Sequence, residues 1–141
     1  MPRNPFMRTR SRGVLLAVCV PVVAAGLLLR TVPGVAGDAA GGILYATLLF
    51  VLIALLMPAA PSVRIGASAF GICVVVELLQ LTGLPTTAAR LVPPIRYALG
   101  TTFVASDLIA YAAGTLGVVL VDHLTVRSIA RRAASRHREG Q

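Results

Sequence analysis

Four apolar runs limit what this chain of 141 residues can fold into more than any motif does. A helix needs about 20 apolar residues to cross a bilayer, because each residue adds only about 1.5 Å of length. Four segments approach that length, at residues 13–30, 39–57, 65–84 and 101–121. The sequence therefore predicts an all-α membrane protein, a four-helix transmembrane bundle between a basic N-terminus at 1–12 and a basic tail at 122–141.

The thirteen basic residues are all arginines, and with five acidic residues they give a formal net charge of +8. Ten arginines fall on one side of the predicted crossings, and Arg30, Arg90 and Arg96 fall on the other. Because arginine-rich segments stay on the cytoplasmic side, we expect both termini to be cytoplasmic. The arginines gather in terminal segments rather than along a recognition element, so we expect no nucleic-acid partner.

A basic start before an apolar run is also typical of a cleaved signal peptide, with residues 35–37 near the cut. We favour a membrane helix, because the run is longer than a usual signal core and its removal would leave three crossings. Cys19 and Cys73 lie within apolar runs, where cysteine usually packs as a small hydrophobic residue. With no ligand cluster or phosphate-binding loop in the sequence, we expect no metal and no cofactor.

Glu77 and Gln80 lie near the end of the third run. A carboxylate at apolar depth costs about 2.5–3.5 kcal/mol on insertion scales, so such residues usually pair, face a protein interior or serve a function. The predicted topology brings further polar residues to the same outward end, since the first and third helices run outward and the others run inward. The candidate site consists of eight residues at this depth: Arg30, Asp38, Tyr45, Glu77, Gln80, Arg96, Asp107 and Tyr111.

Structural explanations also exist for the charged members of this set. Asp38 in the first turn of a helix would complement the helix dipole. Asp107 would pair with Arg96, and Glu77 would pair with Arg30. Taken together, these residues predict a hydrated polar pocket that opens to the outer leaflet.

Three further expectations concern packing. The link at 84–100 contains three prolines, which favours an ordered, partly extended cap rather than another helix. Gly114 and Ala110 would let the fourth helix approach a neighbour closely. At the inner end, Asp122 and His123 are expected to be solvated interfacial groups.

Several short motifs resemble those of a known family. They are Arg30 with Gly37-Asp38, the stretch Glu77 to Leu81, the stretch Leu99 to Phe103, and Asp107 to Tyr111 with Gly114. Over about residues 14–121 the chain resembles the DUF2809 family, which consists of small four-helix membrane proteins of unknown function. Some members carry a ribosome-maturation (YjgA) label, which does not suit an integral membrane chain.

A more distant resemblance follows the order acid, tyrosine, Glu-x-x-Gln, arginine, aspartate. The matching positions are Asp38, Tyr45, Glu77, Gln80, Arg96 and Asp107. This order is similar to the VanZ-like family, which is implicated in resistance to the lipoglycopeptide teicoplanin. The resemblance implies a role at the bacterial cell envelope, although Tyr111 stands where VanZ-like proteins commonly have asparagine.

The leading functional hypothesis is a binding protein of the bacterial cytoplasmic membrane. Its outward pocket would hold a lipid or a lipid-linked envelope precursor, with Arg30 and Arg96 meeting an anionic head group. A membrane hydrolase or transferase acting on a lipid-linked substrate is the second hypothesis, because paired carboxylates suit acid and base roles. A third is a non-catalytic subunit that forms homo-oligomers or binds a membrane partner, and proton or solute transport is a weaker fourth.

Overall fold

The computed structural model describes residues 10–29 and 31–139. In this part of the chain the structure is helical and contains no strand. The helices are α1 (Arg12–Leu29), α2 (Val35–Leu56), α3 (Ser62–Gln80), α4 (Leu84–Leu91), α5 (Ile95–Leu99) and α6 (Ala105–Glu139). Four of them, α1, α2, α3 and α6, are long and apolar enough to cross a membrane, which confirms the prediction of four apolar helices of that length.

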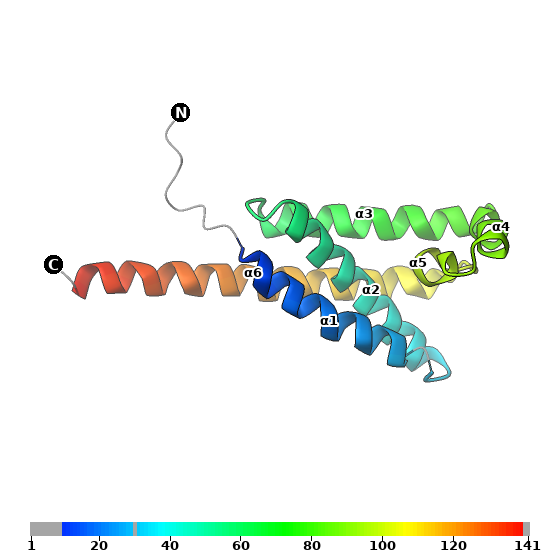
Figure 1. The fold of residues 1–141 in the computed structure, drawn as a ribbon, viewed down its shortest axis with the longest axis horizontal. Coiled ribbons are helices and arrows are strands. Elements are labelled where there is room, and N and C mark those ends of the chain that lie inside the picture. Colours follow the sequence, from blue (N-terminus) through cyan, green and yellow to red (C-terminus); the bar gives the residue numbers. More distant parts are fainter. Residues whose placement is uncertain (1–9, 30, 140–141) are drawn as a thin grey trace, which may run out of the picture.

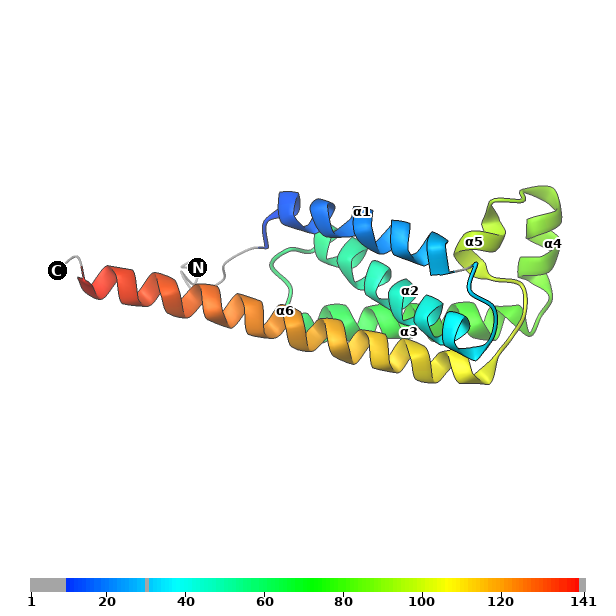
Figure 2. The same cartoon turned by 90° about the horizontal axis from the view of Figure 1, so that it is seen from below.

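The four long helices run alternately up and down, and the short helices α4 and α5 cap one end (Figure 1). Helix α2 is central, because it contacts α1, α3 and α6, whereas α1 packs against α2 alone among the described helices. The start of α1 and the chain's C-terminal part lie at the end opposite the cap (Figure 2). Helix α6 has 35 residues, or about 52 Å at about 1.5 Å per residue, and it extends well beyond the bundle.

Small residues set the closest helix crossings. A Cβ atom on Gly114 of α6 would lie 2.6 Å from the carbonyl oxygen of Ile43 in α2. One on Gly42 of α2 would lie 2.8 Å from the Cβ atom of Ala110. The predicted close approach of Gly114 and Ala110 to a neighbouring helix is therefore confirmed, and that neighbour is α2.

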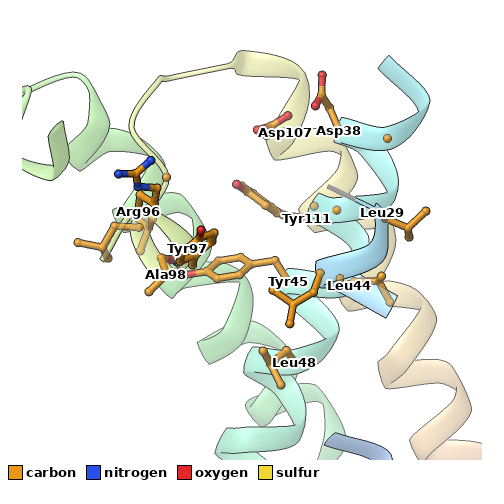
Figure 3. Close-up of a pocket in the computed structure, with 18 of the residues that line it drawn as sticks. Leu29, Asp38, Leu44, Tyr45, Leu48, Arg96, Tyr97, Ala98, Asp107 and Tyr111 are labelled. Atoms are coloured by element: carbon orange, nitrogen blue, oxygen red, sulfur yellow. Dashed lines mark hydrogen bonds between the residues drawn. The ribbon is translucent and has the colours of Figure 1, made fainter. Parts of the chain in front are cut away.

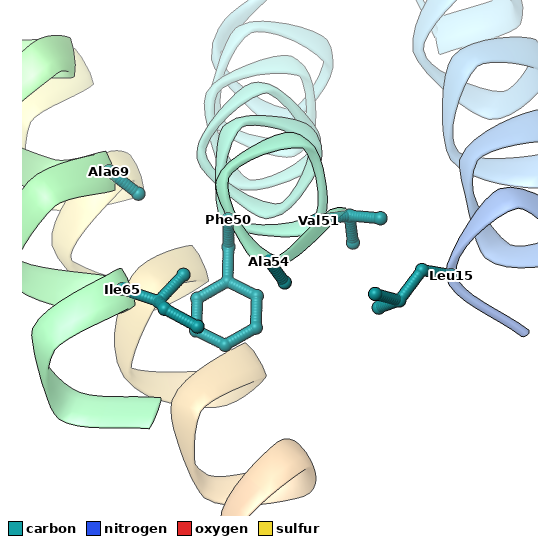
Figure 4. Packing of buried hydrophobic residues seen from close by; sticks show 6 residues of the cluster. All are labelled: Leu15, Phe50, Val51, Ala54, Ile65 and Ala69. Atoms are coloured by element: carbon teal, nitrogen blue, oxygen red, sulfur yellow. The ribbon is translucent and has the colours of Figure 1, made fainter. Parts of the chain in front are cut away.

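Between these crossings and the end opposite the cap lies an apolar core. Phe50 and Ala54 of α2 pack with Ile65 and Ala69 of α3, while Val51 of α2 faces α1 (Figure 4). All five side chains are buried. This packing holds α2 and α3 in place, and it therefore fixes the positions of the polar residues farther along both helices.

The link at 84–100 corrects the sequence-based expectation, because it forms two short helices, α4 and α5, instead of a partly extended segment. Gly83, at a φ of 72°, separates α3 from α4. Pro85 then occupies the first turn of α4, where a proline costs no helical hydrogen bond. Pro93 and Pro94 separate α4 from α5, and Gly100, at a φ of 64°, ends α5. The prolines therefore divide the link into helices rather than preventing them.

Three long helices differ from their predicted bounds, and one of them, α3, runs from Ser62 to Gln80 rather than over 65–84. Helix α2 begins at Val35 rather than near residue 39, which places Asp38 inside its first turn. Helix α6 begins at Ala105 rather than near residue 101 and continues without a break past residue 121. The end of the apolar run is thus not the end of the helix, because the alanines and arginines that follow it are strong helix formers.

The end opposite the cap contains an ion pair that corrects the expectation of a solvated Asp122. Arg10 forms a two-pronged pair with the Asp122 carboxylate, with N···O distances of 2.7 and 2.6 Å. Its remaining N–H groups donate to the carbonyl oxygens of Pro58 and Ala60 and to the Ser62 hydroxyl. The two charged side chains are only 9% and 14% exposed. Arg10 therefore joins the segment before α1 to the α2–α3 turn and to α6.

Candidate functional site

Glu77 joins α3 to the beginning of α6. It is fully buried, with no exposed surface. The backbone N–H of Val104, just before α6, donates to one carboxylate oxygen at 2.7 Å, and the Tyr111 hydroxyl donates to the other at 3.1 Å. Glu77 thus satisfies a backbone donor at a helix N-terminus, where negative charge is favoured.

Two other side chains hold the cap through its backbone. The Tyr45 hydroxyl donates to the carbonyl oxygen of Ala98 at 2.7 Å, and the Gln80 amide donates to that of Leu99 at 2.7 Å. Tyr45 and Tyr111 also contact each other, with ring centroids 6.0 Å apart. These bonds anchor the C-terminal end of α5 to α2 and α3.

A cavity of about 510 Å³ lies between the cap and the adjacent ends of α1, α2 and α6. Its walls near the cap are polar and include Asp38, Arg96 and Asp107 (Figure 3). Farther from the cap the walls are apolar and are formed by side chains of α1 and α2, among them Val22, Val23, Leu27, Leu44 and Leu48. The cavity is therefore amphipathic, and its volume is typical of small-molecule sites, which span about 300–1,000 Å³.

The carboxylates of Asp38 and Asp107 both line this cavity. Each lies in the first turn of its helix, Asp38 in α2 and Asp107 in α6. Neither has a hydrogen bond or an ion pair within the described residues, and the predicted pairing of Asp107 with Arg96 is wrong. Arg96 instead directs its Nε–H to the carbonyl oxygen of Pro93 at 3.1 Å. The cavity therefore has acidic groups that the described part of the protein leaves unpaired.

Residues 31–115 match the model of a family described as protein of unknown function (DUF2809). The match covers more than half of the chain. The chain belongs to the DUF2809 family. No curated protein and no solved structure matches it.

Within this DUF2809 protein, the matched region includes α2, α3, the cap and the first turns of α6. It therefore contains Asp38 and Asp107, which line the cavity, and the hydrogen bonds that hold the cap. The Arg10–Asp122 ion pair lies outside the matched region. Family membership places the chain among proteins of unknown function, so the function must be argued from the site itself.

The structure divides the eight predicted site residues into two groups. Six line the cavity directly: Asp38, Tyr45, Gln80, Arg96, Asp107 and Tyr111. Glu77 lies behind them and is not among the lining residues, because both of its oxygens face α6 and the segment before it. Arg30, and with it the predicted Glu77–Arg30 pair, lies outside the described residues.

Sequence reasoning missed the apolar part of the cavity. Gly26 of α1 and Gly41 of α2 both line it, and a Cβ atom on either would meet no heavy atom within 4 Å. Glycines that are not required for a close helix crossing leave space beside a helix, which is a weak signal that the sequence did contain. This signal becomes visible only when Gly26 and Gly41 are distinguished from the glycines of the close helix crossings, such as Gly42 and Gly114.

Proposed function

We propose that this DUF2809 protein is an integral protein of the bacterial cytoplasmic membrane that binds a lipid or a lipid-linked envelope precursor. The ligand would occupy the amphipathic cavity at the capped end, which would face outward. The single observation that carries the proposal is the joining of a polar region to an apolar wall in one cavity beside exposed membrane-length helices. A head group with attached acyl or isoprenoid chains has the matching polarity.

The distribution of arginines favours this orientation. Arg10, Arg12, Arg64 and Arg127 lie at the end opposite the cap, next to the chain termini. The cap carries only Arg90 and Arg96. Under the positive-inside rule, the end with the termini is cytoplasmic and the cavity opens toward the outer leaflet.

The apolar wall offers a route for the ligand's chains. Helix α1, which packs against α2 alone, contributes Val22, Val23 and Leu27 to the cavity. Its other faces carry exposed apolar side chains, such as Val20 at 71% and Leu28 at 69%. A hydrocarbon chain that leaves the cavity would therefore continue along an apolar helix surface rather than enter water.

The test is to fill the cavity without disturbing the fold. Leucine at Gly41 would extend into the cavity, because nothing lies within 4 Å of an added Cβ atom. The matched control is Gly117→Leu, an exposed α6 position that also has no neighbour within 4 Å and does not line the cavity. Both variants would be reconstituted in lipid nanodiscs, and retained lipid would be identified by native mass spectrometry.

We expect Gly41→Leu to lose the lipid that wild type and Gly117→Leu retain. Equal retention by all three proteins would contradict the proposal. It would instead favour a non-catalytic subunit that recognises a membrane partner or another copy of the chain.

An enzyme acting on a lipid-linked substrate is the second candidate, and one observation favours it. Two carboxylates without described partners, Asp38 and Asp107, line the same cavity, and such a pair can divide acid and base roles. The lipid identified in the nanodisc experiment would be incubated with wild-type protein and with Asp107→Asn. Product formation by wild type alone would establish catalysis, while an unchanged lipid in both would leave binding as the function.

A further inference from the structure

Three uncharged hydrogen-bond donors at the polar end of the cavity are in use, whereas the Arg96 guanidinium uses only its Nε–H among the described residues. The Tyr45 hydroxyl donates to Ala98, the Tyr111 hydroxyl donates to Glu77, and the Gln80 amide donates to Leu99. All three residues line the cavity. Their donor atoms are therefore already paired within the protein before any ligand arrives.

The acceptors at the same end are not in use. The carboxylates of Asp38 and Asp107 have no hydrogen bond and no ion pair within the described residues. The side-chain oxygen of Gln80 is buried and has no hydrogen-bond partner, which is uncommon in folded proteins. Three acceptors without partners thus line one cavity, and a ligand that supplies donors would satisfy them.

The charges of the lining residues indicate which kind of donor group a ligand would carry. The charged lining residues in the described part are two acids and one base, Asp38, Asp107 and Arg96. Arg96 comes from α5 and lies across the cavity from the two carboxylates in Figure 3. A positively charged donor complements the acids, and an anionic group beside it complements Arg96.

The location of Asp38 and Asp107 at the starts of helices explains only in part why acidic residues occur there. Asp38 and Asp107 each lie in the first turn of a helix, where the dipole favours a negative charge. However, α2 has no side-chain hydrogen bond at its N-cap, and the free N–H before α6 is satisfied by Glu77 rather than by Asp107. The dipole stabilises the charge but leaves the carboxylate oxygens as acceptors facing the cavity.

We infer that the ligand carries a primary ammonium group, bound by the carboxylates of Asp38 and Asp107, and a phosphate that meets Arg96. A phospholipid with an ethanolamine head group has this chemistry. The inference rests on the proposed function and makes it more specific. It also reverses the anionic head group expected from the sequence, which depended on Arg30 as well as Arg96.

The test compares three phospholipids with identical acyl chains. Phosphatidylethanolamine supplies ammonium donors, phosphatidylcholine supplies positive charge without N–H donors, and phosphatidylglycerol supplies hydroxyl donors with net negative charge. The full-length protein would be placed in nanodiscs containing equal amounts of all three, and retained lipids would be counted by native mass spectrometry. The proteins would be wild type, the Asp38→Asn, Asp107→Asn double variant, and Gly41→Leu.

We expect wild type to enrich phosphatidylethanolamine about tenfold over the other two lipids, since one charge-assisted hydrogen bond is enough for that ratio. The double asparagine variant should still retain lipid but lose this enrichment. Neither aspartate is bonded to the described protein, so the variant should lose only the small helix-dipole stabilisation and remain folded, and its unfolding temperature is measured in parallel.

Different failures are distinguishable. Enrichment of phosphatidylglycerol, equal retention of phosphatidylcholine, or enrichment that survives in the double variant would overturn the head-group inference. The proposed function would stand in those cases if Gly41→Leu still displaces the lipid. Lipid retention unaffected by Gly41→Leu would overturn both.

Discussion

Replacing Glu77 tests how the cap is attached to the bundle. The residue is fully buried, and its two oxygens accept hydrogen bonds from the Val104 N–H and the Tyr111 hydroxyl at 2.7 and 3.1 Å. Alanine would remove both acceptors and leave the buried Tyr111 hydroxyl and the part-buried Val104 N–H without partners. Glutamine would keep one carbonyl oxygen for Val104 and turn an amide toward Tyr111.

The magnitudes follow from these two bonds. A hydrogen bond to a charged group contributes about 1.5–3 kcal/mol, so Glu77→Ala should lower the free energy of unfolding by about 3–6 kcal/mol. Glu77→Gln keeps the bond to Val104 and weakens the one to Tyr111, so its loss should be about 1–2 kcal/mol. The two substitutions should therefore differ by about 1–5 kcal/mol.

The protein contains a suitable reporter for this measurement. Cys73 is fully buried one helical turn before Glu77, and it packs with Ala46 and Tyr111. In a Cys19→Ala background, Cys73 would react with a thiol-specific dye only when α3 separates from its neighbours. Labelling in mixed micelles of increasing denaturing-detergent fraction then gives the free energy of unfolding.

The control is Leu78→Ala, at the next position of α3, where the side chain is 53% exposed. We expect this substitution to change the free energy of unfolding by no more than about 0.5 kcal/mol. Equal destabilisation by Glu77→Ala and Glu77→Gln, or no destabilisation by either, would refute the assignment of Glu77 as the residue that holds α6 and the cap.

The remaining predictions use the same labelling assay. Asp122→Ala leaves the part-buried Arg10 guanidinium with its hydrogen bonds to the α2–α3 turn but without a counter-charge, and it should cost about 3 kcal/mol. Arg10→Met with Asp122→Leu should recover most of that loss, and no recovery would argue against the pair. Gly114→Ala forces a Cβ against the Ile43 backbone and should cost about 1–3 kcal/mol, while Gly117→Ala, with open space beside it, should cost nothing. Equal effects of the two glycine substitutions would contradict the close crossing.

The number of membrane helices was predictable because it depends only on the length and polarity of continuous segments. The gathering of polar residues at one end was predictable for the same reason, since alternating helices place positions such as Asp38 and Asp107 at one depth. The hydrogen-bond partners of the individual side chains were not predictable. Glu77 is satisfied by the backbone of Val104, and a backbone N–H has no signature in the sequence.

The short cap helices and the Arg10–Asp122 pair show two further limits. Pro85 permits a helix when it falls in the first turn and forbids one in the interior, so prolines alone did not decide between α4 and an extended link. Arg10 and Asp122 are 112 positions apart. Only the packing of α6 beside the α2–α3 turn brings them together. The positive-inside rule already explained an arginine near the N-terminus, so the sequence contained no reason to look for a partner of Arg10.

Different polar residues attach the cap and line the cavity as unbonded acceptors, so mutations can test cap attachment and ligand binding separately. Tyr45, Glu77 and Gln80 use their hydrogen bonds to hold backbone groups between residues 98 and 104. Asp38 and Asp107 hold nothing in the described chain. Residues that maintain the fold should therefore affect both stability and lipid retention when replaced, whereas these two aspartates should affect the choice of lipid alone. Asp38 is exposed and Asp107 is half-buried, so both carboxylates are open to water and to a ligand alike. A change of lipid choice without a change of stability, on replacement of these two aspartates, would therefore separate a binding role from a structural one.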